Sequence, residues 1–134
     1  MSSQITRKQV EWDRASCRGL DTKLFYVMRG ELADEGFSYN YLRRMCFDCP
    51  IQKECLQIGT SMERYGFWGG LAEEERTAIY ESSRHISPGH IKILDRLKRD
   101  LQFHPGKYQE LQTIVYSVKR VFGIFDFTGR PTND

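Results

Sequence analysis

The chain has 134 residues, enough for one ordinary domain or for a small domain with an extension. Hydrophobic residues make up 40% of it and charged residues 28%, with a net charge of +2, which excludes a disordered acidic chain. No apolar run approaches the length of a membrane span and the first eight residues lack the apolar core of a signal peptide, so we expect a cytoplasmic protein with no membrane partner.

The first part of the chain is expected to hold short helices separated by irregular segments. Residues 4–15 favour a short helix, whereas residues 18–36 contain three glycines and are expected to be mostly irregular. Ser38 can cap a following helix that ends near Cys46, because its side-chain oxygen can accept a hydrogen bond from the first helical turn.

Two more helices are expected before a break at residues 84–89. Pro50 suits the first turn of a helix that runs to about Gly59, since the N–H that proline lacks is not needed there. Residues 72–83 favour another helix, and the three glutamates in its first turn complement the helix dipole.

The last part of the chain has the pattern of two amphipathic helices. Ser87 and Pro88 are a suitable cap and first turn for one helix, and Pro105 and Gly106 suit a turn that leads to the next. We therefore expect a helical hairpin over residues 88–122 and an all-α fold, because no alternating segment is long enough for a sheet. The apolar residues at helical spacing are Ile91, Leu94, Leu97 and Leu101, then Tyr108, Leu111, Ile114, Val118, Val121 and Phe122.

Charge divides the chain at the same break. Residues 1–83 hold 11 Lys+Arg and 13 Asp+Glu, whereas residues 84–134 hold 9 and 5. We expect a cysteine-containing domain over 1–83 and a C-terminal helical extension with a tail over 84–134. The basic extension could contact DNA in the manner of a helix-turn-helix, with Lys119 and Arg120 near phosphate, or could be a packing or dimer surface.

The four cysteines are the main chemical signal in the sequence. Cys46, Cys49 and Cys55 lie within ten positions, and a gap of 28 residues separates them from Cys17. By the expected helix boundaries, Cys46 ends one helix, Cys49 precedes the next and Cys55 lies inside it. Four thiolates that converge from two helices would suit a soft metal ion or an iron–sulfur cluster.

Several kinds of site are compatible with these cysteines. A disulfide framework would allow three pairings, but a reducing cytoplasm disfavours it. A structural zinc site would make the chain a protein-interaction adaptor, and spacing alone fits zinc and an iron–sulfur cluster equally well. A thiol–disulfide oxidoreductase could use Cys46-x2-Cys49, although the βαβ context of such enzymes is absent from the pattern.

The residues around the cysteines favour the cluster. The chain resembles the WhiB-like family over residues 9 to about 80, and four cysteines in this order before a Gly-aromatic-Trp-Gly-Gly turn form a specific combination. The motifs that carry the resemblance are Trp12, Cys17-Arg18, Leu24-Phe25-Tyr26, Cys46-x2-Cys49-Pro50-x4-Cys55, Gly66-Phe67-Trp68-Gly69-Gly70-Leu71 and Glu73-Glu74-Glu75-Arg76.

The resemblance implies a small, all-helical transcription regulator of actinobacteria or their phages, without enzymatic activity. Such proteins hold a [4Fe–4S] cluster that often responds to oxygen or nitric oxide. Many bind the C-terminal region of the primary sigma factor of RNA polymerase through hydrophobic contacts near the cluster. Matched by position, the ligands would be Cys17, Cys46, Cys49 and Cys55. The partner-binding residues would be Trp68, Phe25, Tyr26 and Trp12, with Gly66, Phe67, Gly69 and Gly70 of the turn.

The chain departs from the family pattern in two places. Phe67 replaces the usual valine or isoleucine of the turn, and the Arg/Lys-rich DNA-binding tail of many members is represented here by Arg130 alone. The resemblance to the family therefore does not indicate a role for the C-terminal extension. Basic residues close to the cysteines could offset the charge of a cluster or form ordinary solvated surface; these are Arg18, Arg43, Arg44 and Lys53.

Overall fold

The computed structural model describes residues 9–20, 22–26, 29–34, 36, 38–63, 65–82 and 87–121. In these ranges the regular structure is helical, and the only β feature is one isolated bridge between Trp68 and Leu71. The all-α prediction is confirmed. The α-helices are α1 (Arg29–Asp34), α2 (Tyr39–Phe47), α3 (Gln52–Met62), α4 (Glu73–Glu81), α5 (Pro88–Asp100) and α6 (Lys107–Val121). The short 3-10 helices are η2 (Trp12–Arg14), η3 (Thr22–Phe25) and η4 (Leu101–Phe103).

Two helices begin at the serine caps that the sequence predicts, but α3 begins at Gln52 with Ile51 as its N-cap, so the prediction that Pro50 lies in its first turn was wrong. Ser38 caps α2 by accepting a hydrogen bond of 3.1 Å from the Tyr41 N–H, and Ser87 caps α5 in the same way through the His90 N–H at 3.1 Å. Pro88 occupies the first turn of α5, and three glutamates occupy the first turn of α4. These contacts satisfy backbone donors that have no partner within the helix.

Other predictions about local structure were also wrong. Residues 18–36 contain η3 and α1 rather than irregular chain, because Leu24 and Leu32 are buried in a cluster with residues of α2. In addition, α3 continues past Gly59 to Met62. Of the helix predicted over 4–15, the structure describes residues 9–15, where a 3-10 turn is formed instead.

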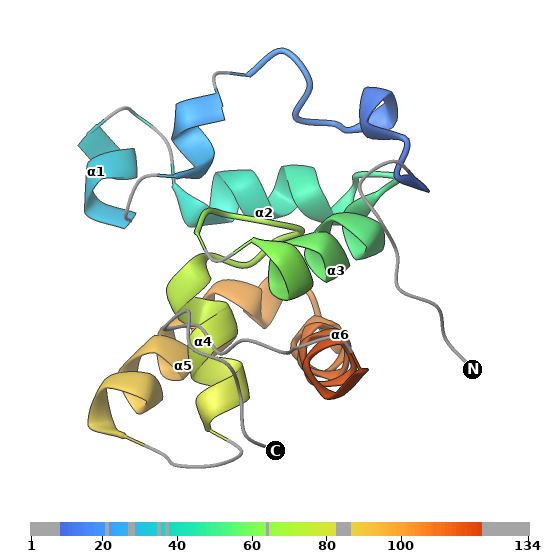
Figure 1. Ribbon diagram of the computed structural model, residues 1–134. Helices are drawn as coiled ribbons and strands as arrows, with labels where there is room; N and C mark the ends of the chain where they lie inside the picture. Colours follow the sequence, from blue (N-terminus) through green and yellow to red (C-terminus); the bar gives the residue numbers. More distant parts are fainter. Residues whose placement is uncertain are drawn as a thin grey trace.

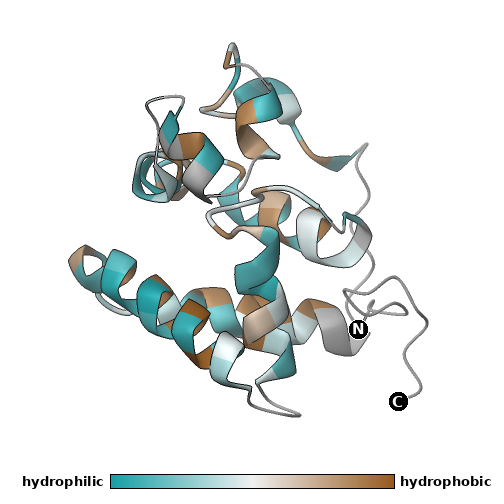
Figure 2. Cartoon of the chain, turned by 90° about the vertical axis from the view of Figure 1, so that its left-hand side faces the viewer, coloured by the Kyte–Doolittle hydropathy of each residue, from teal (hydrophilic) through white to brown (hydrophobic). Residues whose placement is uncertain are grey.

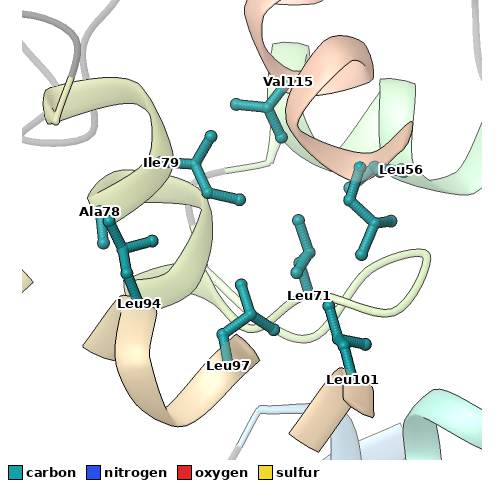
Figure 3. Packing of buried hydrophobic residues seen from close by; sticks show 9 residues of the cluster. Leu56, Leu71, Ala78, Ile79, Leu94, Leu97, Leu101 and Val115 are labelled. Carbon is teal, nitrogen blue, oxygen red and sulfur yellow. The ribbon is translucent and has the colours of Figure 1, made fainter. Parts of the chain in front are cut away.

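The main core joins the cysteine-bearing part of the chain to the extension. In Figure 1, α4, α5 and α6 lie below α2 and α3; α6 packs against α3 and α4, and α5 packs against α4. Figure 3 shows side chains from α3, α4, α5 and α6 directed toward one another. The buried members of this cluster are Leu56, Leu71, Ala78, Ile79, Leu94, Leu97, Leu101, Leu111 and Val115. The cluster therefore draws on both sides of the break near residue 84.

The helices of the extension are amphipathic, as predicted, but Ile91 of the expected face is exposed, and Phe122 and the side chain of Val121 lie outside the described part of the chain. Figure 2 shows helices that carry both hydrophilic and hydrophobic residues. Ile91 is exposed because α5 packs through Leu94 and Leu97. In α6, Val115 is buried although the apolar pattern did not predict it as a core residue. None of the helices that the structure describes is long and apolar enough to cross a membrane.

Candidate metal centre

One cavity is lined by all four cysteines. Cys46 lies in the last turn of α2, Cys49 lies between α2 and α3, and Cys55 lies inside α3, as the sequence predicts. Cys17 comes from the segment that follows η2. The empty space between the lining side chains, including the part open to solvent, is about 330 Å³. The other lining residues are Trp12, Ala15, Met45, Ile51, Gln52 and Gly69.

The cysteines are free thiols that surround the cavity. Within the described ranges, no group of three or more His, Cys, Asp or Glu side chains is arranged to hold a metal ion as it stands. Burial is the main cause that raises the pKa values of Cys17 and Cys46, and burial raises that of Cys55 to about 12. Charge on neighbouring cysteines raises all three further. The thiols of Cys17, Cys46 and Cys55 are therefore protonated at neutral pH, and each would have to lose its proton to bind iron or zinc.

Backbone N–H groups face the sulfurs. The N–H of Ser16 donates to Sγ of Cys49 at 3.4 Å. The N–H groups of Gly69 and Gly70 interact with the sulfurs of Cys55 and Cys46, respectively, and favour their thiolate forms. Such donors stabilise thiolates and, in iron–sulfur proteins, tune the reduction potential. The donor set of the cavity thus fits a thiolate-ligated group.

The turn that supplies two of these donors requires glycine at both central positions. Gly69 and Gly70 have φ values of 60° and 104°, and the flanking Trp68 and Leu71 exchange backbone hydrogen bonds of 2.9 and 3.1 Å. A β-carbon at Gly69 would lie 2.6 Å from the backbone N of Leu56. This combination of positive φ and close approach places the turn directly on α3.

Buried side chains hold the carbonyl groups of the same turn. Gln52 donates from Nε2 to the carbonyl oxygen of Gly69 at 2.6 Å, and Arg43 donates from Nη1 to that of Gly70 at 3.1 Å. The Gly69–Gly70 peptide group is therefore held at both ends, since Gln52 binds its carbonyl oxygen and its N–H interacts with the Cys46 sulfur, whereas Arg43 holds the following carbonyl group. Among the four basic residues expected near the site, Arg43 is buried, whereas Arg18, Arg44 and Lys53 are exposed.

Arg76 is a buried cation that the sequence analysis missed. It donates to the carbonyl oxygens of Gly66 at 2.7 Å and Glu63 at 3.1 Å, and also to that of Gly59. Its charge favours the thiolate of Cys55. Burial lowers the pKa of Arg76 to about 10, so the side chain is still charged at neutral pH. A signal was present in the sequence, because an arginine directly follows the three glutamates that begin α4.

The aromatic residues predicted to bind a partner form an edge beside the cavity. Trp68 is half-buried, donates from Nε1 to the carbonyl oxygen of Tyr65 at 2.9 Å, and meets Trp12 edge to face with ring centres 6.2 Å apart. Tyr26 is 49% exposed and lies next to Gly66, where a β-carbon would be 2.8 Å from the Tyr26 ring. These rings give the surface near the cysteines an aromatic character.

The remaining predicted partner residues lie deeper. Phe67 is only 6% exposed and packs against Tyr39, with ring centres 5.3 Å apart. Phe25 is half-buried, and its carbonyl oxygen accepts a hydrogen bond of 2.6 Å from the Phe67 N–H. Phe25 and Phe67, like the buried Gly66, Gly69 and Gly70, therefore lie beneath the aromatic edge of Trp12, Tyr26 and Trp68 rather than on its surface. Of the predicted DNA-binding residues, Arg130 and the side chains of Lys119 and Arg120 lie outside the described part of the chain.

Comparisons with known proteins agree with this site. Residues 12–79 match the family model of the transcription factor WhiB. Transcriptional regulator WhiD of Streptomyces coelicolor is 37% identical over 79 residues, which cover 55% of this chain and 70% of the relative. Transcriptional regulator WhiB2 of Mycobacterium tuberculosis is 35% identical over 71 residues, 52% of this chain and 73% of the relative. Redox-responsive transcriptional regulator WhiB3 of Mycolicibacterium smegmatis is 36% identical, with coverages of 51% and 76%. No solved structure matches the chain.

Proposed function

Because the chain belongs to the WhiB family of transcription factors, we propose that it holds a [4Fe–4S] cluster and regulates transcription by binding the primary sigma factor. It is a transcription regulator and not an enzyme. The observation that carries the proposal is the single cavity lined by all four cysteines, with the Gly69-Gly70 turn directing backbone N–H groups at two of them. A cytoplasmic location accompanies a role at RNA polymerase.

The charges around the cavity support a cluster. Four thiolates around a [4Fe–4S]²⁺ core carry a net charge of about −2, which is costly to bury without compensation. The backbone N–H groups of Ser16, Gly69 and Gly70 and the buried guanidinium of Arg76 supply that compensation. When bound, the cluster supplies redox chemistry and sensitivity to oxidants. A structural zinc site is the alternative use of the same thiols, and metal analysis distinguishes the two.

The position of Trp68 supports a sigma factor as the partner. Gly69, the next residue, interacts with the Cys55 sulfur, so the aromatic edge and the cysteine site share one turn. Large, partly exposed aromatic rings are frequent anchors of protein interfaces. Loss of the cluster would replace the thiolates that the turn contacts by protonated or oxidised cysteines. This would weaken the contacts that hold the edge and would provide a route from oxidation to partner binding.

The experiment is a binding measurement between the chain and the C-terminal region of the primary sigma factor. Cluster-loaded protein, prepared without oxygen, is expected to bind, and protein stripped of iron is expected to bind at least tenfold more weakly. Equal affinity of the two forms would contradict a cluster-dependent aromatic edge. Absence of binding by both forms would contradict the sigma factor as partner.

One observation favours an additional contact with DNA. Helix α5 exposes four basic side chains. Asp95 is its one exposed acidic residue, because Asp100 at the end of the helix is mostly buried. Lys92, Arg96 and Arg99 recur at helical spacing and can face one phosphate backbone. Duplex binding that weakens steeply with salt, and that is reduced when these three residues are changed to glutamine, would support this contact. Salt-independent behaviour would contradict it.

A further inference from the structure

A buried ion-pair network links the cysteine site to the C-terminal extension. The side chain of Arg43 is 1% exposed and forms two hydrogen bonds with Glu75, at 2.6 and 2.8 Å, and one with Asp100, at 2.7 Å. The same guanidinium donates to the carbonyl oxygen of Gly70. Burial alone would lower the pKa of Arg43, but its two carboxylate partners more than offset this and raise it.

The place of Asp100 in its helix is unfavourable without this partner. Asp100 is the last residue of α5, where the helix dipole disfavours a negative charge. Its carboxylate is mostly buried, with a side-chain exposure of 14%, so water provides little compensation. The contact with Arg43 therefore accounts for a carboxylate at this position.

Three contacts lead from Asp100 to a cysteine. Asp100 accepts a hydrogen bond from Nη2 of Arg43, and Nη1 of the same guanidinium donates to the carbonyl oxygen of Gly70. The N–H of Gly70 interacts with the sulfur of Cys46. Asp100 lies 57 residues from Arg43 in sequence and outside the 12–79 segment that matches the family. The family pattern therefore does not account for this connection.

A second contact joins the same two regions. Phe47 directly follows Cys46, and a β-carbon at Gly70 would lie 2.6 Å from its ring. His104, in the connection between α5 and α6, meets that ring edge to face with centres 5.0 Å apart. The amine of Lys107 lies 4.9 Å from the ring centre. The extension thus packs against the residue next to a cysteine, and that residue in turn packs against Gly70.

We infer that Asp100 is a positioning residue for the cysteine site. Through it, the C-terminal extension controls how accessible the thiols are to reagents and how strongly they retain a cluster. Asp100 keeps Arg43 on the Gly70 carbonyl and so helps to fix the position of Gly70, whose N–H interacts with the Cys46 sulfur. Its negative charge also opposes addition of an electron to the site. The effect on a cluster rests on the proposed function, whereas the effect on thiol accessibility does not.

The test compares Asp100→Asn with Asp95→Asn, which makes the same change on an exposed residue of the same helix. On cluster-loaded protein, Asp100→Asn should shift the reduction potential upward and should speed loss of the cluster to a chelator at least threefold. On the metal-free protein, it should speed labelling of the thiols by a disulfide reagent to a similar degree. Asp95→Asn should leave all three readouts at wild-type values.

A third variant distinguishes charge from geometry and covers the case in which Asp100→Asn does not fold. Asp100→Glu keeps the charge but displaces the carboxylate, so it should speed thiol labelling without the upward shift of the reduction potential that loss of the charge causes in Asp100→Asn. The inference is overturned if Asp100→Asn, or Asp100→Glu where the former is unfolded, labels at the rate of Asp95→Asn. A wild-type chain without iron would contradict the proposed cluster, and the labelling rates would still decide the role of Asp100.

Discussion

Gly59 in α3 packs directly against Trp68, so closely that a β-carbon at position 59 would lie 2.5 Å from Cγ of the indole. The helix that carries Cys55 and the turn that carries Trp68 therefore fit together only because position 59 has no side chain. The carbonyl oxygen of Gly59 also accepts a hydrogen bond from Arg76. This contact makes a glycine in the middle of a helix a determinant of both the cysteine site and the aromatic edge.

Replacement of Gly59 by alanine is expected to displace the Trp68 ring. Overpacking of this kind costs about 1–3 kcal/mol, which here exceeds the gain of up to about 1 kcal/mol in helix propensity. Trp68 fluorescence and the midpoint of thermal unfolding should both change. Gly89→Ala is the matched control, because its β-carbon would meet nothing nearer than the Ser87 Oγ at 3.9 Å. A Gly59→Ala protein as stable as Gly89→Ala would refute the tight fit.

Each of the four cysteines is expected to be necessary for the cluster. Serine has nearly the same shape as cysteine but is a poor ligand for iron in this setting, so Cys→Ser at position 17, 46, 49 or 55 should abolish the visible absorbance of protein reconstituted without oxygen. The far-UV circular dichroism of each variant serves as a check on folding. Full cluster content in any of the four would remove that residue from the ligand set.

Trp68 is expected to act as an interface anchor. Trp68→Ala should weaken binding to the sigma factor region by about 2 kcal/mol or more, roughly 30-fold, while iron content stays at the wild-type level. Tyr65→Ala is a useful comparison, since Tyr65 is 56% exposed and lies beside the indole. If Trp68→Ala instead prevents cluster binding, the indole is a structural part of the cysteine site and the anchor role is wrong.

The extension is expected to be essential to the stability of the fold. Leu97 is fully buried in the main core, so Leu97→Ala should lower the free energy of unfolding by about 2–5 kcal/mol. Ile91→Ala, on the exposed side of the same helix, should cost about 1 kcal/mol or less. Denaturant unfolding followed by circular dichroism measures both. Similar losses for the two variants would mean that α5 does not pack as the structure shows.

The local features of this fold were predictable from sequence because they depend on local chemistry. The caps Ser38 and Ser87 set the starts of α2 and α5 through hydrogen bonds to residues three positions away. The placement of the cysteines relative to the helices followed from those boundaries. The domain boundary near residue 84 stays a prediction, and the core that joins its two sides depends on contacts that no local pattern reveals.

The features that were not predictable depend on distant partners. A charged residue in a helix usually lies in solvent, so nothing local indicated that Arg43 and Asp100 meet across 57 residues. The same holds for Arg76, which binds carbonyl groups of α3 and of the chain that follows it. The spacing of the cysteines likewise indicated a set of ligands but not the backbone N–H groups that face them.

The central claim is that the four cysteines hold a [4Fe–4S] cluster, and the content of iron and acid-labile sulfide tests it most directly. The protein would be purified without oxygen, and its metal content and absorption spectrum measured together. A brown protein with about four irons and four sulfides per chain is the predicted result. A colourless protein that retains one tightly bound zinc ion would contradict the claim and identify the chain as a zinc-stabilised member of its family.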